Sequence, residues 1–187
     1  MTNTSDKLLL AIRELEAEVE REFTEQRRRF HYTFKKKRVT FEAAVRQQHK
    51  KFRVGLARFL RQSGPARIFG AAIVYAQIVP LLLLDVAVSL FQWVCFPIYN
   101  IDPVPRGDFI VIDRHHLAYL NPIEKLNCAF CGYANGLLAY AREIAGRAEA
   151  HWCPIKHARK TRGQHRRYWE FADYGDAETY RKNQKDN

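Results

Sequence analysis

Residues Ile68 to Tyr99 read IFGAAIVYAQIVPLLLLDVAVSLFQWVCFPIY, with no lysine or arginine and a single acidic residue, Asp85. About 20 apolar residues suffice to cross a hydrocarbon core that is roughly 30 Å thick. The run is therefore long enough to enter or cross a membrane, and we expect the rest of the chain to be organised around it. The alternative is the core helix of a soluble domain, but an apolar stretch of about 10–14 residues is the usual length for such a helix.

Pro80 divides this run, because a proline inside a helix removes a hydrogen bond and bends the axis. Two geometries are open: one tilted helix that crosses the bilayer, or a re-entrant helical hairpin that bends near Pro80 and returns to its side of entry. Residues 1–67 hold 17 Lys and Arg against 8 Asp and Glu, and residues 100–187 hold 14 against 11. Because cytoplasmic flanks collect basic residues, these two basic flanks favour the hairpin. We expect an inner (cytoplasmic) membrane protein whose soluble parts face the cytoplasm.

Asp85 is the one ionisable acid within the apolar run. A charged side chain in hydrocarbon costs about 2.5–3.5 kcal/mol. We therefore expect a partner for the carboxylate, and the sequence offers Gln77, Gln92 or a basic residue of another subunit.

Residues 1–63 are predicted to form one long amphipathic basic helix, or two helices with a hinge. Between residues 5 and 62 there is no proline, and apolar residues recur at steps of three, four or seven. Ser5 is the expected N-cap, and Ser63-Gly64-Pro65 the expected end. The first half is acidic and the second basic, which suits an interfacial helix on anionic lipid or a coiled coil. The same stripe could instead dock on the rest of the chain.

The net charge of +11 and the pI near 9.7 indicate an acidic partner. Anionic lipid fits the apolar run best, and a protein partner or an oligomer is expected as well. Nucleic acid is the weaker alternative, because the phenylalanines recur at helical spacing, which marks one buried face rather than a platform for stacked bases.

Residues 100–180 are predicted to form a small α+β domain, followed by a polar tail over residues 181–187. Phe109 to Ile112 is rich in β-branched residues and predicts a short strand. Ala134 to Ala150 has the periodicity of a helix. With the segments 1–63 and 64–99, this gives a mainly α chain.

The cysteines of the last segment have the spacing of a metal site. Cys128 and Cys131 are separated by two residues and followed by glycine, and Cys153 precedes His157 by four. This C-x2-C-x21-C-x3-H set predicts a Cys3His knuckle that binds structural zinc. His151 could replace His157. A redox dithiol, an iron centre and unmetallated cysteines are the alternatives.

Asp113, His115 and His116 are candidate catalytic residues, because paired Asp and His side chains serve general acid–base chemistry. Adjacent histidines at the end of a strand point in opposite directions, so one of them at most would join Asp113. The leading hypothesis is a non-catalytic, zinc-stabilised adaptor or complex subunit anchored at the cytoplasmic face of the membrane. The alternative is a membrane-associated hydrolase or redox enzyme that uses this turn or the Cys128/Cys131 pair.

Overall fold

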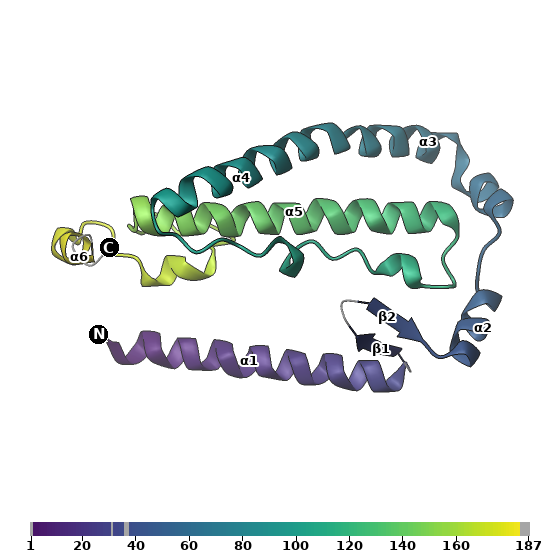
Figure 1. Cartoon of the computed structure of the whole chain (residues 1–187), viewed down its shortest axis with the longest axis horizontal. Coiled ribbons are helices and arrows are strands. Elements are labelled where there is room, and N and C mark those ends of the chain that lie inside the picture. Colours follow the sequence, from purple (N-terminus) through teal and green to yellow (C-terminus); the bar gives the residue numbers. More distant parts are fainter. Residues whose placement is uncertain (1, 31, 36–37, 184–187) are drawn as a thin grey trace. The chain divides into compact units, whose positions relative to one another are not determined.

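The computed structural model describes the chain except residues 1, 31, 36–37 and 184–187 (Figure 1). The described part is mainly helical, as the sequence predicted. It divides into two compact units, one made of residues up to Phe59 with Asp113–Lys125, the other of Leu60–Ile112 with the residues from Leu126 onward. The elements are α1 (Thr2–Arg29), β1 (Tyr32–Lys35), β2 (Arg38–Phe41), α2 (Ala43–Lys51), α3 (Leu56–Ala76), α4 (Ile78–Ile98), α5 (Pro122–Trp152) and α6 (Ala177–Asn183).

The first unit contains α1, a hairpin and α2 in place of the continuous helix predicted over residues 5–62. β1 and β2 pair in an antiparallel register that places Tyr32 opposite Phe41 and Phe34 opposite Val39. Both strands carry the aromatic and β-branched residues that favour strands. Phe34 and Phe41 are seven residues apart, and this spacing imitates a helical repeat although the two side chains belong to paired strands.

The start of α5 also belongs to this unit, and a reciprocal cap defines it. The Asn121 carboxamide oxygen accepts a hydrogen bond from the Glu124 N–H at 3.0 Å, and the Glu124 carboxylate accepts one from the Asn121 N–H at 2.8 Å. Pro122 occupies the first helical position, where its missing N–H is not needed. The helix predicted over Ala134–Ala150 is therefore the later part of a longer helix.

In the second unit, α3 and α4 follow one arched path rather than folding back on each other as a hairpin (Figure 1). Gly64 has φ 70° and ψ 160°, so the expected stop at Ser63-Gly64-Pro65 is a kink within the helix. α4 begins just after Gln77, which places Pro80 in its first turn. A proline there breaks no hydrogen bond, and this is why the chain does not reverse at Pro80.

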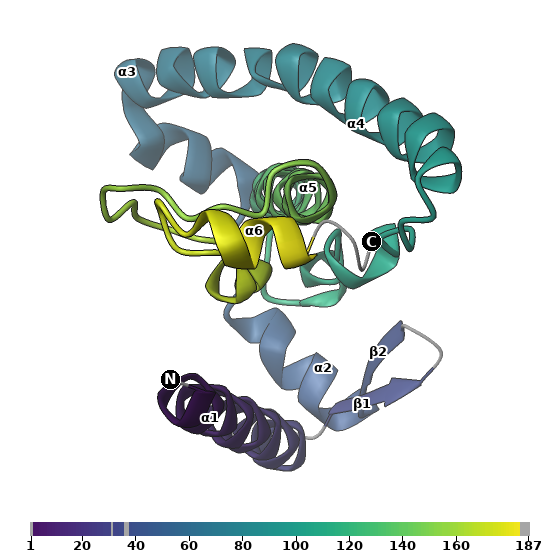
Figure 2. The same ribbon diagram turned by 90° about the vertical axis from the view of Figure 1, so that its left-hand side faces the viewer.

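α5 lies along the inner side of the α3–α4 arch and runs in the same direction (Figures 1 and 2). The Tyr75 ring of α3 contacts Phe130 of α5 with 5.6 Å between centroids, and the Tyr99 ring beyond α4 contacts Trp152 at 4.9 Å. Two parallel neighbours need a connection that travels back along their length. We call residues 100–112, the part of this connection that lies in the second unit, the return segment. It is irregular except for a 3₁₀ turn at Arg106–Asp108.

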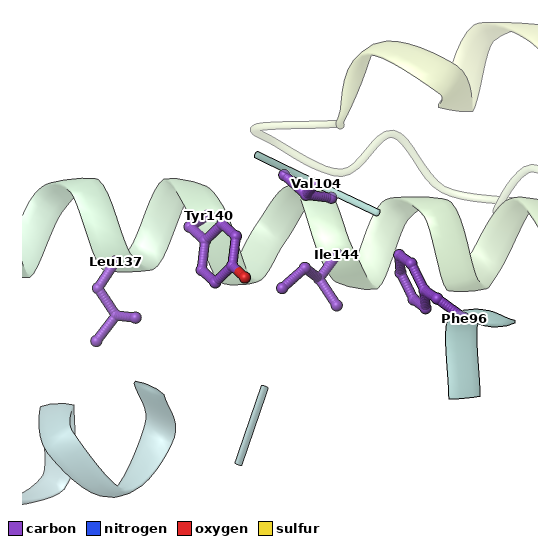
Figure 3. Packing of buried hydrophobic residues seen from close by; sticks show 5 residues of the cluster. All are labelled: Phe96, Val104, Leu137, Tyr140 and Ile144. Atoms are coloured by element: carbon purple, nitrogen blue, oxygen red, sulfur yellow. The ribbon is translucent and has the colours of Figure 1, made fainter. Parts of the chain in front are cut away.

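The return segment is not the strand predicted at Phe109–Ile112. In the described part of residues 100–187 the one β-contact is an isolated bridge between Ile155 and Ala172, so the expected α+β domain does not form. The β-branched residues of the segment pack on a helix instead of a sheet. The core cluster shows this, because Val104 lies among four residues of α4 and α5 (Figure 3): Phe96, Leu137, Tyr140 and Ile144.

Two glycines of α5 allow the return segment to approach closely. A Cβ on Gly136 would lie 2.6 Å from the Phe109 carbonyl oxygen, and one on Gly132 would lie 3.1 Å from that of Val111. Because the neighbouring atoms belong to the backbone, they cannot rotate away. Glycine is therefore required at residue 136 by packing rather than by helix conformation.

We expect Gly136→Ala to destabilise the fold by about 1–3 kcal/mol, the usual cost of an added methyl group in a filled space. Thermal unfolding in detergent, followed by circular dichroism, measures this. Gly70→Ala in α3 is the matched control, because no atom lies within 4 Å of its added Cβ. The control should gain up to about 1 kcal/mol from helix propensity. Equal melting temperatures for the two variants would show that the return segment does not pack on Gly136.

Candidate functional site: the two faces of α4

The outer side of α3 and α4 is an apolar surface. Along α4 five exposed apolar positions follow one line at steps of four and three: Val79, Leu83, Val86, Leu90 and Trp93. Ile68, Phe69, Ile73 and Val74 continue the exposed apolar surface on α3. We call these nine residues the outer face.

By length and composition, the helix from Leu56 to Ile98 could cross a membrane, and among the described residues it is the one helix that could. Its most apolar stretch is only 6% buried. The core helix of a soluble domain would be mostly buried, so the exposure of the outer face argues against that alternative.

The inner side of α4 carries a polar stripe. Asp85, Ser89 and Gln92 follow one another at steps of four and three, which places them on one face of the helix. This face is turned toward the return segment and α5, where Asp85 and Gln92 find hydrogen-bond partners, and Ser89 donates to Asp85 within α4. α4 is therefore apolar toward the outside and polar toward the rest of its unit.

Asp85 pairs with Arg106 of the return segment. The Arg106 guanidinium donates to both carboxylate oxygens, with Nη2 to Oδ2 at 2.6 Å and Nη1 to Oδ1 as the second contact. The Tyr133 hydroxyl donates to Oδ2 at 2.7 Å, and the Ser89 hydroxyl to Oδ1 at 3.3 Å. The carboxylate side chain is only 12% exposed. A bidentate ion pair with further hydrogen bonds is the arrangement that keeps a carboxylate ionised away from water.

The electrostatics of this group follow from the same contacts. The hydrogen bond to Asp85 raises the pKa of the Arg106 guanidinium. Burial, with the hydrogen bond to Asp85 as the next cause, raises the pKa of the Tyr133 hydroxyl. Both shifts keep the two donors protonated. The Arg106 guanidinium also lies 5.8 Å from the centre of the Tyr140 ring, a cation–π contact that ties it to α5.

The predicted partners of Asp85 were Gln77, Gln92 or another subunit, and that prediction was wrong. Gln92 instead holds the backbone of the return segment: its Oε1 accepts from the Val104 N–H at 2.8 Å, and its Nε2 donates to the Tyr140 hydroxyl at 3.1 Å. A signal for Arg106 was present, because it is the single Lys or Arg between Arg67 and Arg114. An isolated cation close to an isolated buried anion is a pairing that sequence reasoning can look for.

The structure does not bring the residues of the predicted Cys3His knuckle together. Cys128 and Cys131 lie within α5 rather than in a turn, and Cys153 follows the other end of that helix. At 1.5 Å per residue, the 24 steps from Cys128 to Trp152 span about 36 Å, whereas a zinc–sulfur bond is about 2.3 Å long. No three His, Cys, Asp or Glu side chains converge on a metal position within the described residues.

The fourth predicted ligand, His157, has another environment. Its N–H donates to the Tyr168 hydroxyl at 2.6 Å, and its ring lies 6.0 Å from that of Tyr168. The alternative ligand, His151, packs its ring at 5.3 Å from Tyr99. The two histidines therefore belong to separate aromatic contacts.

Asp113, His115 and His116 lie at a 3₁₀ turn over residues 114–116 of the first unit. The centroids of the two histidine rings lie 3.9 Å apart, so the prediction that the side chains point in opposite directions was wrong. The physical reason is that a 3₁₀ turn rotates successive residues by about 120°, whereas a strand rotates them by 180°. The rings contact each other, both histidines are exposed, and Asp113 joins them through its carbonyl, which accepts the His116 N–H at 3.0 Å.

The C-terminal segment is fastened to α5 by polar contacts. His165 Nε2 lies 2.9 Å from a Glu149 carboxylate oxygen, its ring covers Gly146, and Arg142 donates to the Gln164 carbonyl. The charged end of α5 is therefore a docking surface for this segment. Comparisons of the chain with protein-family models, with curated proteins and with solved structures found no match.

We expect a double-mutant cycle on Asp85→Ala and Arg106→Ala to give a coupling free energy of about 1–3 kcal/mol. The value lies below that of a fully buried pair because the Arg106 side chain is 44% exposed. Denaturant unfolding in detergent measures it. The Lys156–Asp173 pair, with Asp173 68% exposed, is the control and should couple by less than about 1 kcal/mol. Additive effects of the two alanines would rule out the ion pair.

Proposed function

We propose that this protein is a membrane-anchored, non-catalytic adaptor or complex subunit that acts at the cytoplasmic face of the inner membrane. The observation that carries the proposal is the division of α4 into an exposed apolar outer face and a satisfied polar inner stripe. A soluble protein places its apolar side chains in the opposite way, because contiguous exposed apolar surface beyond a few hundred Å² is rare on soluble monomers. Lipid is the environment in which this exposure is stable.

Charge favours anionic lipid as the surface that the protein contacts. Arg58, Arg61 and Arg67 precede the outer face, and all three are exposed. Arg159, Lys160 and Arg162 are exposed beyond the end of α5. Near a membrane surface each such cation contributes about 1 kcal/mol with acidic headgroups. The outer face and these flanking cations together support attachment to an anionic leaflet.

α1 supports the adaptor part of the proposal. Leu15, Val19, Phe23 and Phe30 are exposed along one side of the chain at and just beyond this helix. Glutamates concentrate before residue 26, and Arg27, Arg28 and Arg29 follow. A second copy in antiparallel orientation would place arginines beside glutamates along the same apolar stripe. We therefore propose α1 as the arm that binds a partner helix, with a second copy as the partner.

In this proposal the second unit is held together by the Asp85–Arg106–Tyr133 group. The four predicted ligands are too far apart within one chain, as the length of α5 requires. The enzyme alternative is not proposed, because no observation favours it over the adaptor.

We expect the full-length protein to sediment with vesicles that contain phosphatidylglycerol and to resist extraction with carbonate. Leu83→Arg, at a position that is 67% exposed on the outer face, should weaken binding at least tenfold, because a charge in hydrocarbon costs about 2.5–3.5 kcal/mol. Leu138→Arg is the matched control: this leucine of α5 is 53% exposed and lies one turn from Arg142. The control should bind as the parent does. A parent protein that remains soluble without detergent contradicts the membrane proposal.

We expect Val19→Lys to reduce self-association in detergent at least fivefold, because it places a charge in the apolar stripe of α1. Analytical ultracentrifugation measures the dissociation constant. Ala17→Lys adds the same charge on the opposite side of the helix and should leave the constant unchanged. A monomeric parent at all concentrations would refute α1 as a self-pairing arm.

A further inference from the structure

After membrane attachment through the outer face, α4 could either cross the bilayer or lie in the membrane plane. The polar contacts of its inner face decide between these two orientations. The inference below rests on the membrane association proposed above and specifies the surface that makes it. It concerns the second unit alone, whose helices α3, α4 and α5 are seen from two directions in Figures 1 and 2.

α5 accompanies α4 over its whole length. Tyr75 of α3 lies against Phe130, Asp85 and Gln92 of α4 lie against Tyr133 and Tyr140, and Tyr99 just after α4 lies against Trp152. The contacts therefore follow the same order along the α3–α4 path and along α5. A helix in this arrangement cannot cross a bilayer alone. If α4 crossed, α5 and the return segment would have to cross beside it.

The return segment is unsuited to hydrocarbon. Arg106 is held at the level of Asp85, three residues from the middle of α4, and Asp102 and Asp108 on either side of it are exposed. In a crossing orientation these exposed charges would lie near the bilayer centre, at about 2.5–3.5 kcal/mol each. The segment is also non-helical over most of its length, and exposed non-helical backbone does not occur in contact with lipid.

The second half of α5 is also unsuited to hydrocarbon. Tyr140 lies at the level of Gln92, and the residues that follow include Arg142, Glu143, Arg147 and Glu149. Arg142 is exposed, and Arg147 donates at 2.6 Å to the Asp102 carbonyl of the return segment. The end of α4 therefore has charged groups beside it on its inner side, where water must reach them.

The polar groups lie on one side of α4, and the outer face lies on the other along its full length. We propose that the outer face of α3 and α4 is a monotopic binding surface for an anionic leaflet: the helix lies in the membrane plane, with its apolar line in the acyl boundary. The return segment and α5 stay on the aqueous side. The chain then enters and leaves on the same side, in agreement with basic residues on both flanks.

Depth-dependent quenching of tryptophan by brominated lipids tests this orientation. The chain has three tryptophans, at residues 93, 152 and 169, so a variant in which Trp152 and Trp169 are phenylalanine reports on Trp93 alone. Four further variants also replace Trp93 and carry one tryptophan each, at Val79, Leu83, Val86 or Leu90. Together the five variants report on positions along the whole outer face of α4. Vesicles of phosphatidylglycerol and phosphatidylcholine brominated at different acyl positions are the probe, and binding is first established by sedimentation.

In the proposed orientation all five positions have the same depth to within about one helical turn, 5.4 Å, and all lie in one leaflet. A crossing helix would change depth by about 1.5 Å per residue, or about 21 Å between residues 79 and 93, with the deepest point between them. That steep profile would overturn the in-plane surface while leaving membrane attachment intact. Tryptophan at Leu138, on the charged side of α5, should be unquenched.

A second measurement on the natural sequence covers the case in which tryptophan variants do not fold. An epitope tag is added at either terminus, and protease is applied to inverted membrane vesicles and to spheroplasts. The proposal expects both tags to be cleaved in inverted vesicles and protected in spheroplasts. Tags cleaved in different preparations would overturn it, and a protein recovered without membranes would overturn the proposed function itself.

Discussion

The ion pair between Asp85 and Arg106 is the contact on which the second unit depends. It joins α4 to the return segment across 21 positions of sequence, and the Tyr133 hydroxyl adds α5 to the same carboxylate. An unpaired carboxylate in this apolar helix would be costly, so folding of the second unit requires Arg106 to pair with Asp85. Gln92 repeats the arrangement two turns further on by holding the Val104 backbone. Two polar residues of one helix therefore set the course of the return segment.

The path of the return segment explains why α5 contains glycine at residue 136. Parallel helices require a connection that runs back between them, and here it passes so close to α5 that Gly136 has no room for a side chain. The core is correspondingly small, with Phe96 and Val104 meeting three residues of α5. This small core leaves the outer face of α3 and α4 exposed.

Several features of the structure could be predicted from local sequence patterns. The apolar run and the need for a partner at Asp85 follow from composition and from single residues whose chemistry is restrictive. The cysteine spacing failed for a physical reason: C-x2-C describes a turn or one turn of helix equally well, and the cap at Asn121 and Glu124 starts the helix early enough to include both thiols. The Phe34 and Phe41 spacing failed similarly, because a step of seven fits either a helix or two paired strands.

The sequence by itself determined that the chain is mainly helical and that residues 68–99 are long and apolar enough to span a membrane, because hydrophobicity and helical periodicity are local properties. Only the tertiary structure decided which residue neutralises Asp85, where the return segment runs and why the helix beside it contains glycine. These depend on contacts between segments 20 to 50 residues apart, such as Asp85 with Tyr133. The direction in which α4 turns its polar side follows from them, since Asp85 and Gln92 find their partners on the return segment and α5 and a carboxylate away from water needs such partners.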